Sequence, residues 1–331
     1  MVTYIKLRRN FKIYAIKGIL ILSLFSFVSP SVYAVDVLVL SPDRDYYAEM
    51  LNGLEQSIGD EIILHKFKIS RQSSVQKFVE EFESIRPAAV IMVGNQSVSL
   101  YQRFQRINKE RTYPPAIALA TLHINSALSN VKNATGIRHD VPLSLAAAKL
   151  NLIAHKKVAK IGVIHRKYMS EIIERNSKLC EAEQIELVAI ELPDKSSYSE
   201  KEIKRALKLL KRKKIDALWL VSDTALLNSH MMMNVWMPNL GKLELPVIVN
   251  TDRLASTLLE LGSISVTPDD LELGRQAGAL LHKLLDPETA EIDGDFENIQ
   301  SVKALVNLNI LDKNKVRYKR EFLSTFDEIV E

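Results

Sequence analysis

Residues 265–285 read SVTPDDLELGRQAGALLHKLL, and this stretch combines the two signals on which the predicted fold depends. A β-branched run stops at a proline, two acidic residues follow, and a helical pattern of apolar residues begins. Asp269 and Asp270 suit the N-terminus of that helix, where a carboxylate accepts hydrogen bonds from unpaired N–H groups. Gly274 and Gly278 lie on one helical face, so we expect close packing there rather than a phosphate-binding loop, whose glycine motifs are missing from the stretch.

The same succession of strand and helix patterns fills the N-terminal half of the chain. Short apolar or alternating runs, each closed by a turn signal, predict strands at residues 35–40, 62–69, 88–93 and 116–120. Helical spacing follows these runs up to residue 54, over 75–85 and up to residue 107. Four strand and helix units within about 100 residues are typical of a parallel sheet with both faces covered by helices.

The succession then starts again in the second half. Strands are predicted at residues 159–164, 185–190, 217–221 and 246–249, with a further strand-like run at 263–266. Helical patterns lie between them at residues 168–183, 199–213 and 225–237. Two similar halves predict an α/β fold with two doubly wound parallel-sheet lobes. Ligands of such sheets bind outside the carboxyl ends of the strands, so we expect the ligand site at the turns after each strand.

Residues 1–34 have the composition of an export signal. Five Lys or Arg and no acid precede an apolar run at residues 19–28, and a proline and small residues lead up to Ala34. A run of about ten residues is too short to span a hydrocarbon core about 30 Å thick. We therefore expect a signal peptide that is cleaved after Ala34 and a periplasmic protein, with a retained N-terminal anchor as the alternative. No cysteine follows the apolar run before Cys180, so no lipid anchor is expected.

The charge balance argues against a nucleic-acid partner. The chain has 44 Lys and Arg and 40 Asp and Glu, and five of the basic residues lie in the predicted signal peptide. The remaining 39 basic and 40 acidic side chains give the mature chain a net charge of −1. Nucleic-acid binding needs clustered, uncompensated basic residues. Because Cys180 is the only cysteine, no intramolecular disulfide is possible and the core must stabilise the fold.

Five short motifs in a fixed order carry a family resemblance. They are NATGI at 133–137, VAKIGV at 158–163, DALWLVSDT at 216–224, PVI at 246–248 and LGRQAG at 273–278. Together they resemble the ABC-transporter substrate-binding proteins of the type I periplasmic-binding fold, in the family that includes aromatic amino-acid binders. The resemblance covers most of the mature chain and is best from Asn133 to Leu285.

The resemblance implies a two-lobed clamp whose lobes are joined by a hinge with three crossings. It implies a monomeric, non-enzymatic protein that needs no cofactor or metal. Such a protein would capture a small molecule, such as an amino acid or a related compound, and deliver it to a membrane ABC permease. By analogy, the first lobe comprises residues 35–136 plus 267–290, and the second comprises residues 137–266 plus 291–331.

Turns after strands of the first half supply one set of candidate ligand contacts. They are Ser41, Tyr46, Gly94, Asn95, Gln96, Ser97 and His123. The turn at Gly94 starts a predicted helix, whose free N–H groups and nearby hydroxyl can hold a carboxylate, although ordinary helix capping is the alternative. Asn95 stands where the family usually has threonine, and His123 where it often has an acid. These departures leave the ligand specificity open.

The second half supplies the other candidate contacts. They are His165, Tyr168, Asp223, Thr224, Asp252 and Arg253. Tyr168 can stack on an apolar or aromatic group of a ligand. Asp223 matches a family aspartate that can pair with a ligand amine, and capping of the next helix is its alternative role. Arg253 can bind a carboxylate with two hydrogen bonds or stay solvated.

Two other signals have ordinary structural explanations. His230 followed by three methionines, with Met237 nearby, contains the ligand types that suit Cu(I). Adjacent residues on a helix diverge by about 100°, so the three methionines cannot face one ion, and we expect a core or cleft-lining helix instead. Residues 204–214 are strongly basic but have leucines at helical spacing, which predicts a solvated amphipathic helix.

Two other function classes stay open. The sequence contains no metal-spaced His and Cys cluster, no G-x-S-x-G motif and no H-E-x-x-H motif, which disfavours an enzyme. Catalytic groups that are scattered along a chain leave no such motif, however. A periplasmic sensory subunit would bind the same kind of ligand and present it to a membrane receptor, and its sequence pattern would be the same.

Overall fold

The computed structural model describes residues 34–331, apart from 71–72, 108, 287 and 289–295. The predicted signal peptide, except for Ala34, and the predicted lobe boundary at residue 290 therefore lie outside the described residues. Within the described ranges, no helix is long and apolar enough to cross a membrane.

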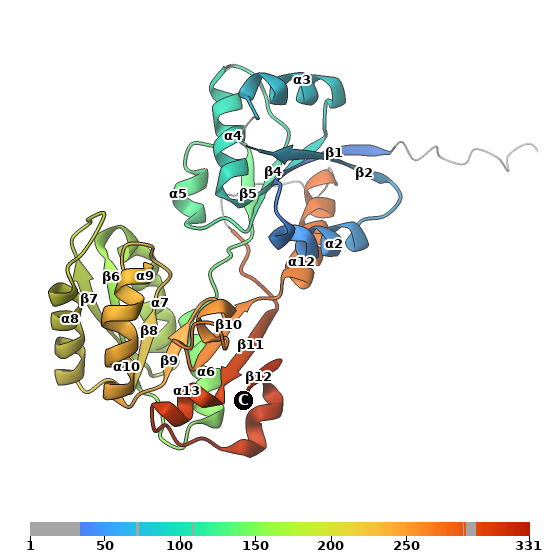
Figure 1. The fold of residues 1–331 in the computed structure, drawn as a ribbon. Helices are drawn as coiled ribbons and strands as arrows, with labels where there is room; N and C mark the ends of the chain where they lie inside the picture. Colours follow the sequence, from blue (N-terminus) through green and yellow to red (C-terminus); the bar gives the residue numbers. More distant parts are fainter. Residues whose placement is uncertain (1–33, 71–72, 108, 287, 289–295) are drawn as a thin grey trace, which may run out of the picture.

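The first sheet has five parallel strands in the order β2-β1-β3-β4-β5 (Figure 1). They are β1 (Val35–Pro42), β2 (Ile62–Ile69), β3 (Ala89–Val93), β4 (Ala116–Leu119) and β5 (Ala134–Gly136). The helices that connect them are η1 (Asp45–Tyr47), α2 (Ala48–Ser57), α3 (Val75–Ile85), α4 (Gly94–Ile107) and α5 (Ile124–Leu128). Every residue of β3 and β4 is buried, as expected for a parallel sheet with helices on both faces.

The second sheet has seven strands in the order β12-β11-β10-β9-β8-β6-β7. They are β6 (Lys160–Arg166), β7 (Glu186–Leu192), β8 (Ala217–Leu220), β9 (Val247–Val249), β10 (Ile264–Pro268), β11 (Val302–Asn307) and β12 (Glu328–Val330). The pair β10 and β11 is antiparallel, and the other pairs of the sheet are parallel.

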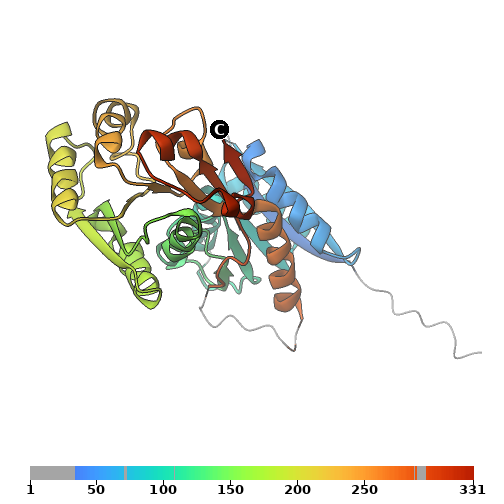
Figure 2. The same cartoon turned by 90° about the horizontal axis from the view of Figure 1, so that it is seen from below.

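Helices of the second half lie mostly around this larger sheet (Figure 1). They are α6 (Leu143–Ile153), η2 (Lys167–Met169), α7 (Ser170–Ala182), α8 (Glu200–Arg212), α9 (Ser229–Met231), the π-helix η3 (Met232–Trp236), α10 (Met237–Leu243), α11 (Asp252–Ala255), α13 (Leu308–Lys313) and η4 (Arg320–Thr325). Helix α12 (Asp270–Leu285) is the exception, because it packs on α2 of the first lobe (Figure 2).

The predicted fold class, an α/β fold with two doubly wound parallel-sheet lobes, is confirmed. In each sheet the first strand lies between the next two along the chain, β1 between β2 and β3, and β6 between β8 and β7. Chain connections leave such a strand in opposite directions, and the carboxyl ends of the strands beside it form a crevice in which ligands bind.

One predicted helix begins at a different residue. The sequence predicted a helix over 225–237, whereas a turn follows Asp223 and helix α9 begins only at Ser229. The reason is local capping, because the Asn228 side chain accepts a hydrogen bond from the Met231 N–H at 3.0 Å. Strands β5, β11 and β12 were not predicted as strands, since they are short or lack a clean alternating pattern.

Three segments of the described chain cross between the lobes, at residues 137–142, 268–270 and 297–302 (Figure 1). They are hydrogen-bonded to one another: the Arg138 N–H donates to the Glu297 carbonyl at 2.9 Å, and the Asp269 N–H donates to the Ser301 carbonyl at 3.1 Å. Phe296 packs against the core of the first lobe, and the predicted lobe boundaries stay a prediction.

Glycines bring α2 and α12 into backbone contact. A methyl group added at Gly274 would lie 2.0 Å from the Met50 carbonyl oxygen, and one at Gly53 would lie 2.0 Å from the Leu271 carbonyl oxygen. At Gly278 it would meet the Ser57 hydroxyl. The predicted packing role of Gly274 and Gly278 is therefore confirmed. Asp269 is the N-cap residue of α12, as predicted, and accepts a hydrogen bond from the Glu272 N–H.

We expect Gly274→Ala to lower the free energy of unfolding by about 1–3 kcal/mol, because the two helices must move apart to accept the methyl group. Chemical denaturation with a helix-sensitive probe measures the change. The control is Gly241→Ala in α10, where the added methyl would meet nothing closer than 3.9 Å. Helix propensity predicts a neutral or stabilising effect for the control. Equal stability of the two variants would contradict the packing explanation.

Candidate functional site

A cavity of about 380 Å³ opens between the two lobes. The first lobe supplies its wall from the start of α4 and from α5 with the loop before it, and the second lobe supplies η2 and α7. The crossing segment after β5 completes the lining. Three of the residues predicted from sequence, Asn95, His123 and Tyr168, line this cavity.

Four charged side chains surround the cavity, and none forms a salt bridge with another residue in the described part of the chain. They are Arg138, Asp140, Glu171 and Arg175. Burial lowers the pKa of Arg175, as does the nearby Arg138 cation, while Asp140 and Glu171 oppose this shift. Two cations and two anions thus face one space with their charges uncompensated by close ion pairs, an arrangement that suits a ligand with charges of its own.

Asn125 connects the two lobes at the edge of this cavity. Its amide oxygen accepts a hydrogen bond from Nη1 of Arg138 at 3.0 Å, and its amide nitrogen donates to a carboxylate oxygen of Glu171 at 2.5 Å. Asn125 belongs to α5 of the first lobe, Arg138 to a crossing segment and Glu171 to α7 of the second lobe. The three side chains therefore link both lobes and the hinge.

An aromatic contact also joins the lobes. The rings of His123 and Tyr168 meet edge to face, with their centroids 5.5 Å apart. His123 has a left-handed backbone conformation with φ of 53°, and the loop before it is held by Asn95. The Asn95 side chain donates to the Leu122 carbonyl at 2.9 Å and accepts from the Leu122 N–H at 3.0 Å. Asn95 thus fixes the loop that presents His123.

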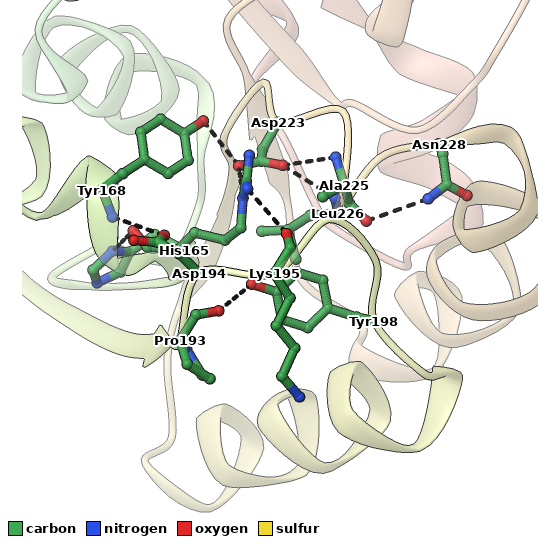
Figure 3. Close-up of polar contacts among 11 residues, drawn as sticks. His165, Tyr168, Pro193, Asp194, Lys195, Tyr198, Asp223, Ala225, Leu226 and Asn228 are labelled. Atoms are coloured by element: carbon green, nitrogen blue, oxygen red, sulfur yellow. Dashed lines mark hydrogen bonds and ion pairs between the residues drawn. The ribbon is translucent and has the colours of Figure 1, made fainter.

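Asp223 lies at the centre of a hydrogen-bond network in the second lobe (Figure 3). Its Oδ2 accepts from Nε of Arg166 at 2.6 Å and from the Tyr168 hydroxyl at 2.9 Å. Its Oδ1 accepts from the N–H groups of Ala225 at 2.8 Å and Leu226 at 3.2 Å. Burial alone raises the pKa of Asp223, but these hydrogen bonds outweigh it and hold the pKa below its usual range.

The turn after β3 packs against the end of β1. Gly94 begins α4 with φ of +75°, and the Tyr47 hydroxyl lies against it. Ser97 is fully buried and its hydroxyl donates to the Leu40 carbonyl at 3.0 Å and the Val93 carbonyl at 2.6 Å. Ser41 is buried at the end of β1. Ser41 and Ser97 do not line the interlobe cavity, and their role as ligand contacts stays a prediction.

The other predicted residues also lie outside the lining of this cavity. Asp252 accepts hydrogen bonds from the hydroxyls of Ser265 and Thr267, which ties α11 to β10. His165 is buried and its Nδ1 lies 3.0 Å from the Arg166 carbonyl oxygen. Exposed side chains belong to Tyr46, Gln96, Thr224 and Arg253. For these six residues the predicted ligand contact stays a prediction.

Sequence reasoning missed most of the charged residues of the site. Arg166 directly follows the selected His165 at the carboxyl end of β6, and β8, which leads to Asp223, is the neighbouring strand. The presence of a cation and an acid at the ends of two strands is a sequence signal that could have identified Arg166. Arg138, Glu171 and Arg175 gave no such signal, because they lie in a crossing segment and along a helix rather than directly after a strand.

No group of three or more His, Cys, Asp or Glu that could hold a metal ion occurs among the residues that the structure describes. In the methionine-rich segment, Met231 is buried whereas Met233 is 68% exposed and Met237 is 41% exposed. The segment packs on the core of the second lobe through Met231, Val235 and Trp236, with Met232 partly buried against the same core, as expected for a core helix, whereas Met233 and Met237 face solvent.

Comparison with solved structures identifies the fold. The ligand-free, open structure of a substrate-binding protein with adhesive properties from Clostridium difficile is similar with a TM-score of 0.64 at 15% identity, over 90% of this chain and 99% of that chain. The ABC domain in complex with L-Trp from Streptococcus pneumonia gives 0.52 at 15% identity, over 90% and 100%. A periplasmic ribose ABC transporter protein from Conexibacter woesei gives 0.50 at 14% identity, over 85% and 93%.

These likenesses show that the chain has the type I periplasmic-binding fold, as the resemblance of its motifs predicted. The three similar structures are described as a complex with L-Trp, a substrate-binding protein and a periplasmic ribose ABC transporter. No protein-family model matches the amino-acid sequence, and no curated protein matches it. The fold is therefore identified by three-dimensional structure.

We expect Asn125→Ala to widen the angle between the lobes, because it removes both hydrogen bonds through which α5 holds the hinge and α7. Exposed hydrogen bonds of this kind contribute about 0.5–1.5 kcal/mol each, enough to shift a balanced conformational equilibrium severalfold. Small-angle X-ray scattering should show a larger radius of gyration than for the wild type. Asn309→Ala, an exposed substitution in α13, is the control, and an unchanged radius in both variants would contradict the linkage.

A partly buried acid at the hinge makes stability depend on pH. Burial and the nearby carboxylates of Glu49, Asp269 and Asp252 raise the pKa of Asp270 to about 6 from its usual 3.8, while Lys303 opposes the shift. The folded state therefore binds a proton more tightly than the unfolded state. Stability is highest below the unfolded pKa, falls as pH rises from about 4 to about 6, and carries a constant penalty above that range.

We expect Asp270→Asn to raise the melting temperature at pH 7.5, because the amide removes the cost of the buried charge. The gain should shrink as the pH falls below about 6 and vanish at about pH 3, below the usual pKa of 3.8, where Asp270 is protonated in both states. Differential scanning calorimetry across this range measures both values. Asp312→Asn, an exposed acid in α13, is the control and should show no comparable dependence. A gain of the same size at both pH values would rule out titration of Asp270 as its cause.

Proposed function

We propose that the protein is a periplasmic solute-binding protein that captures an amino acid or a similarly charged small molecule in the interlobe cavity and delivers it to a membrane ABC permease. The observation that carries the proposal is the cavity itself, which both lobes line. Four of its charged side chains lack a salt-bridge partner among the described residues. The export signal predicted in residues 1–34 supports the periplasmic location, and the proposed role requires no catalysis.

The charges of the cavity match those of an amino acid. Arg175, with Arg138 beside it, can hold a carboxylate through paired hydrogen bonds. Asp140 lies on the same cavity and can accept an ammonium group. Transfer of a charged ligand from water is favourable only where each charge finds a partner, and this cavity offers partners of both signs.

Closure of the lobes supplies the mechanism. A ligand that touches residues of both lobes binds the closed state better than the open one and shifts the population toward closure. His123 and Asn95 would contact the ligand from the first lobe, and Tyr168 and Arg175 from the second. The permease would recognise the surface that the two closed lobes present together. Among the similar structures, one is a complex with L-Trp, which supports an amino acid as the ligand.

The first experiment is a thermal-shift screen. The full chain is expressed in a Gram-negative host, and the exported protein is purified from the periplasm and freed of carried-over ligand by partial unfolding and dialysis. The panel contains the standard amino acids, short peptides, sugars, nucleosides and divalent metals. A ligand at 100 times its dissociation constant stabilises the protein by about 2.7 kcal/mol. We expect a standard amino acid to produce such a shift.

Calorimetric titration of that amino acid then tests the cavity. We expect Asp140→Asn and Arg175→Gln each to weaken binding at least tenfold, or about 1.4 kcal/mol, because each removes the partner of a ligand charge. The controls are Asp312→Asn and Arg205→Gln, which change exposed side chains of the second lobe. If no compound of the panel shifts the melting temperature, the solute-binding proposal is contradicted. If both cavity variants bind the amino acid with unchanged affinity, the ligand site lies elsewhere.

A further inference from the structure

The acceptor capacity of Asp223 is fully used within the protein. A carboxylate offers about four acceptor positions. Asp223 fills them with Nε of Arg166, the Tyr168 hydroxyl and two backbone N–H groups, at distances from 2.6 to 3.2 Å. The side chain is 0% exposed to solvent. A ligand ammonium could reach Asp223 only by displacing one of these donors.

Arg166 already occupies the position of a cation beside Asp223. Besides its bond to Asp223, its Nη1 donates to the Lys195 carbonyl at 3.1 Å. Its guanidinium carbon lies 4.4 Å from the centre of the Tyr168 ring, within the range of a cation–π contact. Only 18% of the Arg166 side chain is exposed. Removing one partner of such a pair leaves a poorly hydrated charge, so displacement of Arg166 by a ligand is unfavourable.

Tyr168 connects the ion pair of Arg166 and Asp223 to the cavity. Its hydroxyl points toward the Asp223 carboxylate (Figure 3), and its ring lines the cavity opposite His123. The same carboxylate therefore fixes one end of Tyr168, and Arg166 covers its ring. The position of the aromatic wall depends on the internal ion pair.

We infer that Asp223 is a positioning residue, which holds Arg166 and Tyr168 in place and does not bind the ammonium group of the ligand. This inference rests on the proposed function, and it reverses the role that the resemblance of the motifs implies for Asp223. An amino acid then loses no specific partner when Asp223 is changed. Discrimination between ligands with and without an ammonium group falls to the cavity acids, foremost Asp140.

The experiment compares two probes on four variants. The probes are the standard L-amino acid with the largest thermal shift and the 2-hydroxy acid with the same side chain, which keeps the carboxylate and lacks the ammonium group. The variants are Asp223→Asn, Tyr168→Phe, Asp140→Asn and the control Asp312→Asn. Calorimetry gives the affinity of each variant for both probes.

We expect Asp223→Asn to weaken both probes by a similar factor, of about tenfold or 1.4 kcal/mol, so that their affinity ratio stays within about twofold of the wild type. Tyr168→Phe, which keeps the ring and loses the bond to Asp223, should weaken both in the same direction. Asp140→Asn should weaken the amino acid selectively. A selective loss of the amino acid in Asp223→Asn would overturn the inference and leave the solute-binding function intact.

A second measurement needs no ligand. The variants Asp223→Asn, Arg166→Gln and the double variant form a double-mutant cycle on the free energy of unfolding. We expect the double variant to be more stable than the sum of the single losses predicts, because removal of both charges leaves neither one unpaired. Additive losses would overturn the inference even if no amino acid binds. Positive coupling together with no thermal shift from any member of the ligand panel would support the positioning role of Asp223 and contradict the proposed solute-binding function.

Discussion

The close contact between α2 and α12 is the constraint on which the arrangement of the two lobes depends. Helix α12 follows β10 of the second sheet, yet it packs in the first lobe, so the chain must cross between the lobes before it and again after it. Four buried leucines of α12 contribute about 1.5–3 kcal/mol each to this docking. Gly274 and Gly278 cost about 1 kcal/mol each in helix propensity, which the leucines outweigh. The two chain crossings on either side of α12 therefore follow from the packing of α12 on α2.

The crossings in turn determine which charges meet at the cavity. Arg138 and Asp140 follow the last strand of the first sheet and lie on a segment that pairs with the returning chain at Glu297. From this position they face α7, which brings Glu171 and Arg175. The cavity therefore depends on tertiary structure, because its acids and cations come from segments that meet only when all three crossings are formed.

The two acids Asp223 and Asp140 differ in whether their charge is paired within the protein. Asp223 is buried, accepts four hydrogen bonds and has its charge balanced by Arg166. Asp140 lines the cavity and has no ion pair among the described residues. A buried charge is stable only with a partner, so the first acid is already satisfied while the second is available to a ligand. This difference, rather than the position of an acid after a strand, is why we propose Asp140 and not Asp223 as the ligand contact.

This distinction explains what could be predicted from sequence. Strand and helix periodicity predicted the two parallel-sheet lobes, and helical spacing predicted the packing of Gly274 and Gly278, because both patterns are local. Asn95, His123 and Tyr168 were found from their places after strands. The rule failed for Arg138 and Arg175, which reach the cavity from a crossing and from a helix. The places of Arg166 and Asp223 after two strands hinted at their pairing, but the pairing itself depends on β6 and β8 being neighbours in the sheet, which the sequence pattern does not specify.

In the proposed function, ligand binding and lobe movement involve the same side chains. Asn125 joins Arg138 of the hinge to Glu171 of the second lobe, and both of these residues line the cavity. A carboxylate that binds beside Arg138 competes with Asn125 for the same guanidinium, and an ammonium beside Glu171 competes for the same carboxylate. Each ligand charge thereby exchanges a protein–protein hydrogen bond between the lobes for a protein–ligand bond. The proposed function therefore implies that ligand affinity and lobe angle are thermodynamically linked through these three residues.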